Sequence, residues 1–139
     1  MNIKYFFILF LFLLTENSCT KKYNLNGKWC GETECAQVCL FFNKNDIVKF
    51  SIFHTEQGQE KETLIFFKYK INYSKNPVWF DLIPLYTNDD SERAKGIIKF
   101  ISDTEFKFRI DFNNPKIRFN NFDIKDKETT IVFKKEIQN

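Results

Sequence analysis

The sequence has few of the residues that enzyme and metal sites usually require. It contains one histidine, His54, and four glycines in 139 residues. A Ser-His-Asp, Cys-His or multi-histidine mechanism would have to use His54, which lies between a predicted strand and a polar loop. No glycine-rich phosphate loop is present, and the adjacent carboxylates Asp89 and Asp90 lie in a polar turn. We therefore predict that the protein is not an enzyme and has no cofactor.

The sequence also has no apolar run long enough to cross a membrane as a helix. The run over residues 5–14 is about half of the ~20 residues that a span requires. Lys4 precedes it, so residues 1–18 have the form of a secretory signal. Cys19 resembles the lipobox cysteine of bacterial lipoproteins, which implies that its thiol is acylated and anchors the chain. The alternative is ordinary signal cleavage nearby and a soluble periplasmic product.

We expect the protein in the cell envelope, as an outer-membrane lipoprotein that faces the periplasm. Thr20 follows Cys19, and no acidic run follows it. The net charge of +3 comes from interspersed basic and acidic residues, a pattern typical of a soluble surface rather than of a polyanion-binding one. Lysines and aromatic residues alternate, so they lie on opposite faces of the predicted strands. We therefore predict no nucleic-acid partner.

Strands are predicted over nearly the whole mature chain. Alanine is rare, whereas Phe, Ile, Tyr, Val and Thr are frequent and often alternate with polar residues. The clearest case is 105–112, where four apolar residues share one face and four charged residues share the other. We predict an all-β fold, a single antiparallel up-and-down barrel of eight or nine strands over 26–136, after a tether over 19–25. Further strands are expected at 26–32, 37–43, 48–52, 67–73, 78–86, 96–102, 116–122 and 129–135.

The remaining cysteines are predicted to form a disulfide rather than a metal site. Cys30, Cys35 and Cys39 lack the paired Cys-x2-Cys spacing of structural zinc sites, and an exported chain favours disulfides. A tight turn at Glu34 and Cys35 would place Cys30 opposite Cys39, with both facing away from Trp29. We favour a Cys30–Cys39 bridge with Cys35 left as a thiol. Bridges from Cys35 to either of the other two remain alternatives.

Three stretches resemble the bacterial lipocalin-like domain proteins. They are Leu25-Asn26-Gly27-Lys28-Trp29, the segment 69–82, and the segment 95–122 with its Asp-bearing hairpin and a later Arg-x-x-x-Phe. Ile98 and Phe119 depart from the usual Tyr and Pro of that group. The resemblance implies a lipocalin-like barrel, with Gly27 and Trp29 at its closed end and Arg118 covering the ring of Trp29.

This resemblance also implies a small apolar ligand, such as a lipid or fatty acyl chain, inside the barrel. Trp79, with Phe80 and Tyr86, is a candidate for the mouth or for an exposed protein contact. The alternative function is a protein-binding module of the inhibitor or immunity type, with the barrel as scaffold. An interior cavity of ~300 Å³ or more would favour the ligand, and a closed core the partner. Besides Trp79, the predicted ligand-binding residues lie on the apolar sides of alternating strands: Phe50, Phe67, Tyr69, Phe106 and Phe108.

Overall fold

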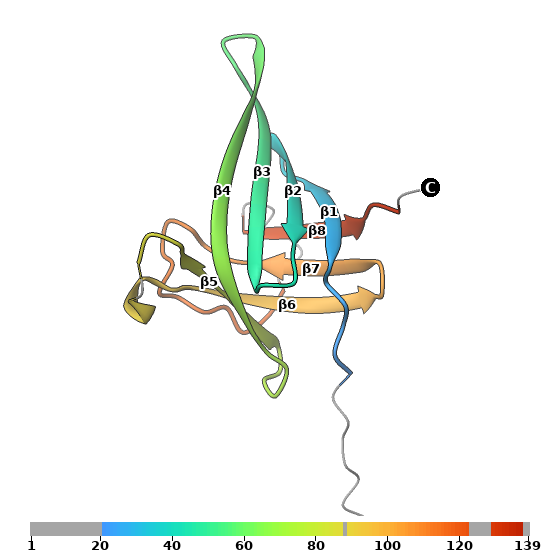
Figure 1. Ribbon diagram of the computed structural model, residues 1–139, viewed down its shortest axis with the longest axis vertical. Coiled ribbons are helices and arrows are strands. Elements are labelled where there is room, and N and C mark those ends of the chain that lie inside the picture. The colour runs from blue at the N-terminus through green and yellow to red at the C-terminus, as the bar shows by residue number, and fades with distance from the viewer. Residues whose placement is uncertain (1–20, 88, 123–128, 138–139) are drawn as a thin grey trace, which may run out of the picture.

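The structure is a computed structural model that describes residues 21–87, 89–122 and 129–137. Eight antiparallel strands close into an up-and-down barrel in which each strand pairs with the next and β8 pairs with β1 (Figure 1). This confirms the predicted fold class. The strands are β1 (Gly27–Glu32), β2 (Ala36–Phe42), β3 (Ile47–Glu56), β4 (Gln59–Asn72), β5 (Val78–Pro84), β6 (Ala94–Ser102), β7 (Glu105–Arg109) and β8 (Thr130–Lys135), with a short 3-10 helix, η1 (Asp90–Glu92).

The barrel consists of two four-stranded halves that cross each other. In Figure 1, β1–β4 run nearly vertically, and β6, β7 and β8 run across them. The halves join where β4 pairs with β5 over Phe67–Asn72, and where β1 pairs with β8 at only two positions, Trp29 and Cys30. Because the β4–β5 seam is short, the part of β4 before Phe67 extends beyond β5.

The strand predicted over 116–122 is wrong. This segment begins at the end of a turn, where the N–H of Ile117 donates to the carbonyl of Asn114, and then runs without regular structure. Two arginines hold this connection: Arg118 bonds to β5, and Arg109 donates to the backbone carbonyl and side chain of Asn121. The alternating segment 105–112 also ends earlier than predicted, because β7 stops at Arg109.

The interior of the barrel is packed with aromatic rings. Trp29 and Phe106 lie 4.8 Å apart between ring centroids, Phe106 and Phe133 5.3 Å, and Phe80 and Phe108 5.2 Å. All five side chains are at most 2% exposed. A Cβ atom at Gly96 would lie 2.7 Å from the ring of Phe108 and 2.6 Å from the carbonyl of Phe80, so only glycine fits there.

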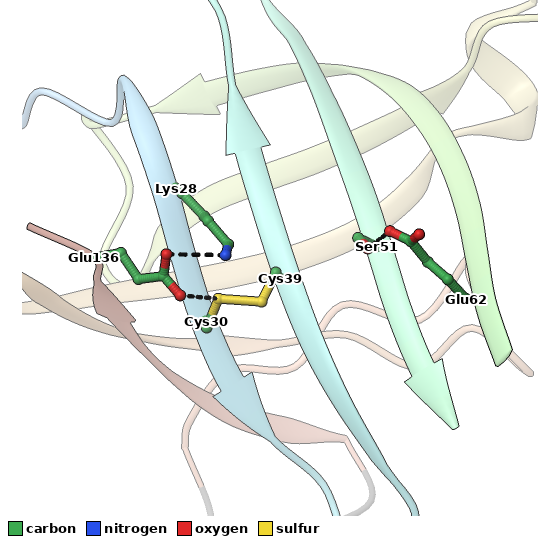
Figure 2. The surroundings of a disulfide bond; sticks show 6 residues. All are labelled: Lys28, Cys30, Cys39, Ser51, Glu62 and Glu136. Atoms are coloured by element: carbon green, nitrogen blue, oxygen red, sulfur yellow. Dashed lines mark hydrogen bonds and ion pairs between the residues drawn. A yellow bond between two sulfur atoms is a disulfide. The ribbon is translucent and has the colours of Figure 1, made fainter. Parts of the chain in front are cut away.

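The predicted Cys30–Cys39 disulfide is present, and Cys35 is a free, exposed thiol. The two half-cystines are directly opposite in the β1–β2 register, with Cα atoms 4.1 Å apart. Figure 2 shows the bridge between the two strands, beside the 2.9 Å ion pair of Lys28 with Glu136. Placing the turn at Glu34 and Cys35 therefore gave the right pairing.

Replacing both half-cystines by serine is expected to lower the free energy of unfolding by about 2–3 kcal/mol, because the bridge closes a short chain loop in the unfolded state. The separation of nine residues sets this magnitude. Urea denaturation of the oxidised mature protein measures it. Cys35→Ser is the matched control and should leave the midpoint unchanged, and equal midpoints for all three proteins would contradict the prediction.

Candidate functional site

Five of the six residues predicted to bind an apolar ligand face inward, and Trp79 does not. Phe50, Phe106 and Phe108 are buried in the core, and Phe67 and Tyr69 are half-buried against it. Burial raises the pKa of the Tyr69 phenol above its ordinary value, since it disfavours the phenolate, and Asp46 adds to this shift. These side chains contact one another and the neighbouring rings, so in the described residues they form a packed core. Hollows of about 380 and 700 Å³ are lined by none of the predicted ligand-binding residues, and one of about 500 Å³ is lined in part by two of them, Tyr69 and Trp79.

Trp79 and Phe80, both predicted for the mouth of the barrel or for an exposed contact, point to opposite faces of β5. For Phe80 that prediction is wrong, because its ring is buried in the core. Strand alternation then places Trp79 on the outer face of β5, where it does not line the interior. There the guanidinium carbon of Arg118 lies 4.0 Å from the centroid of the indole, and Lys75 Nζ lies 4.7 Å from it. The indole is thus covered by cations outside the barrel.

Arg118 does not cover Trp29, so that expectation is wrong as well. Arg118 donates from Nη1 and Nη2 to the two carboxylate oxygens of buried Asp81, at 2.7 and 2.9 Å, on the outside of the barrel. Trp29 lies inside, where its Nε1 donates to the carbonyl of Leu25 at 2.8 Å and Lys135 Nζ approaches its ring. Gly27 has a φ of 115°, a conformation that glycine adopts without strain, which agrees with a structural role.

The most unusual surface is the hairpin of β3 and β4, which projects from the barrel (Figure 1). Gln57 and Gly58 form its turn, both with positive φ, as a two-residue hairpin turn requires. On one edge, β4 pairs with β3 from Gln59 to Lys68. On the other edge, β5 covers it only from Phe67 onward. No strand of the described chain pairs with that edge of Gln59–Phe66, which we call the open edge of β4.

Large apolar side chains are exposed along this open edge. Leu64 is 49% exposed, Ile65 39% and Phe66 46%, and Phe53 on the facing strand β3 is 40% exposed. Because Phe67 points inward, alternation places Phe66 and Leu64 on the outer face and Ile65 on the inner face. A long, apolar, unpaired strand edge is the feature that pairs most readily with another chain.

The same end of the molecule is acidic, although the chain as a whole is basic. Lys61 of β4 forms an ion pair with Glu56. Glu62 accepts a hydrogen bond from Ser51 of β3 (Figure 2). A hollow of about 380 Å³ adjoins the outer face and is lined in part by Phe53 and two glutamates. The five glutamates of the β1–β2 turn and the hairpin are Glu32, Glu34, Glu56, Glu60 and Glu62.

The beginning of the described chain lies at the opposite end of the long axis from the hairpin turn (Figure 1). Cys19 is outside the described residues, and Lys21 is the first within them. The ring of Tyr23 stacks on Phe100 at 3.9 Å, and Leu25 is buried, so the described part of the predicted tether packs against the barrel. Among the described residues, no helix is long and apolar enough to span a membrane.

The open edge is the candidate functional feature that the sequence did not predict. The sequence predicted a strand over 67–73 only, because the alternation there is regular. The preceding Thr63-Leu64-Ile65-Phe66 run has no alternation, yet its β-branched and aromatic residues favour a strand. This run, next to four polar residues, was the sequence signal for a strand that begins before residue 67.

No protein-family model, curated protein or solved structure matches this chain. The likeness to lipocalin-like domain proteins therefore stays an interpretation of the sequence.

Proposed function

We propose that this protein is an exported protein-binding module that takes up an extended segment of another envelope protein along the open edge of β4. The observation that carries this proposal is the unpaired edge of Gln59–Phe66 with three exposed apolar residues in a row. An added strand would satisfy the free backbone donors and acceptors of that edge and cover its apolar side chains. The barrel would act as the rigid scaffold.

The packed interior supports this reading over the apolar-ligand alternative. A ligand-binding barrel needs space inside, whereas the inward rings of this barrel contact one another. Binding of a lipid or fatty acyl chain stays a prediction of the sequence resemblance.

Strand addition can be tested with a capped peptide of alternating Thr and Val. Saturating peptide should slow hydrogen exchange of the amides in Gln59–Phe66, and leave exchange in β2 unchanged, because β2 pairs on one edge with β1 and on the other with β3. A peptide methylated at alternate backbone nitrogens is the control and should give no protection. Protection that is absent, or equal in β2 and β4, would contradict the proposal.

The anchor has a separate test. A lipid at Cys19 would hold the hairpin on the side away from the membrane, within reach of a partner. Cys19→Ser should shift the protein from the membrane fraction to the soluble periplasmic fraction, because it removes the only thiol at the lipobox position. A variant that stays as membrane-associated as the wild type would contradict lipidation, without bearing on the strand site.

A further inference from the structure

We infer that the segment bound at the open edge carries two basic and two apolar side chains on its outward face. The two basic side chains lie opposite the part of β4 next to the hairpin turn, and the two apolar side chains lie opposite the part that follows. This inference rests on the proposed function and deepens it, because it specifies the chemistry of the partner. It follows from which side chains of β4 share the outer face.

The outer face of the open edge is divided into two chemically different halves. Phe67 and Tyr69 pack toward the core. Side chains alternate along a strand, so the even-numbered residues before Phe67 point outward. In order along β4 these outward residues are two carboxylates and then two apolar side chains: Glu60, Glu62, Leu64 and Phe66. A strand added at this edge places its own outward side chains about 4.5–5.5 Å from these, where charge and apolar contact are both felt.

The two outward carboxylates keep their negative charge available to a partner. Lys61 is on the opposite face of β4, where it forms an ion pair with Glu56. Glu62 receives a hydrogen bond from the neutral hydroxyl of Ser51. Glu60 forms no ion pair with any residue in the described ranges, and both glutamates are exposed. Basic side chains on the added strand would complement them, whereas acidic ones would be repelled.

A second copy of this chain fits the open edge poorly. In two-fold antiparallel pairing of the open edge with itself, centred on Thr63, the outer faces of both copies lie on the same side, so Glu60 would lie opposite Phe66 and Glu62 opposite Leu64. The charged half of one copy would meet the apolar half of the other. Charges on an edge strand oppose this kind of self-association. The order of residues in β4 therefore favours a different chain with the complementary order.

Two capped octapeptides test this inference on the folded mature protein. The first is Phe-Val-Leu-Thr-Lys-Thr-Lys-Ser. Its order is written for antiparallel pairing with β4, the pairing that all strand pairs of the barrel use. The second has Glu in place of both Lys. At about 0.02 M salt the lysine peptide should bind at least about tenfold more tightly, and the ratio should shrink at about 0.5 M salt.

The matched protein control is the double variant Glu60→Gln and Glu62→Gln, which removes both charges from exposed positions and should bring the two peptides within about twofold of each other. Hydrogen exchange of Gln59–Phe66 reports whether the peptide is bound at the edge. Equal affinity of the two peptides in the unmodified protein, with protection of Gln59–Phe66, would overturn the basic composition and leave the strand site standing.

Two further outcomes are equally decisive. If neither peptide protects Gln59–Phe66, the proposed function fails together with this inference. If the same segment becomes protected without peptide as the protein concentration rises, the occupant is a second copy and the inference is overturned.

Discussion

Replacement of Phe108 by alanine is expected to lower the free energy of unfolding by about 3–5 kcal/mol, the cost typical of removing a fully buried phenylalanine ring. Phe108 is 2% exposed, its ring meets Phe80 edge-on at 5.2 Å, and it also packs over Gly96. In a core this tight, the surrounding rings cannot fill the cavity that the alanine leaves. Urea denaturation measures the loss.

A matched control separates the loss of buried packing at Phe108 from the effect of removing any phenylalanine ring. Phe66→Ala removes a phenylalanine that is 46% exposed on β4, and we expect it to cost less than about 1 kcal/mol. A loss below about 1 kcal/mol for Phe108→Ala as well would mean that free space surrounds the ring. That result would favour the apolar-ligand alternative over a closed core.

Removing the Asp81 carboxylate is expected to destabilise the barrel by about 2–4 kcal/mol. Asp81 is 3% exposed and holds two arginines, Arg118 through two hydrogen bonds and Arg93 at 3.3 Å. In Asp81→Ala the guanidinium of Arg118 loses its carboxylate partner and keeps only the carbonyl of Gly96, whereas Arg93 keeps its ion pair with Asp90. The expected cost is below that of a fully buried pair, because the arginine side chains are 16% and 25% exposed and can partly reach water.

A double-mutant cycle with Arg118→Ala checks the mechanism of this loss. Removing both partners should cost clearly less than the sum of the two single variants, because no unpaired charge at the Asp81–Arg118 contact is then left. Additive losses would mean that the two side chains contribute independently. In that case, the ion pair is not what joins the 110–122 connection to β5.

The sequence predicted the parts of the fold that depend on local pattern. Alternation identified the strands that build the barrel, and the turn at Cys35 gave the Cys30–Cys39 pairing. The error at 116–122 has a physical cause: this segment is rich in strand-forming residues, but it is fixed by side-chain bonds of Arg118 and Arg109 rather than by a backbone ladder. Such long-range bonds leave no local signal.

The contacts of Arg118 and the open edge of β4 could not be predicted for a related reason. The resemblance placed Arg118 near Trp29, but only the three-dimensional arrangement decides that it lies outside the barrel, on Asp81 and Trp79. Likewise, a sequence can predict that a segment forms a strand, but not how much of that strand pairs with a neighbour. The length of the β4–β5 seam, Phe67–Asn72, is a property of the closed barrel.

Site-specific photo-crosslinking in intact envelopes tests the central claim most directly. A photoreactive residue in place of Leu64, which lies on the open edge, should give an adduct with one envelope protein. The same residue in place of Ile117, which is 55% exposed and lies outside the strands, should not. Mass spectrometry of the adduct should identify an extended partner segment with two alternate basic residues next to apolar ones. No adduct from Leu64, or the same adducts from both positions, would contradict the claim that the open edge of β4 binds a partner strand.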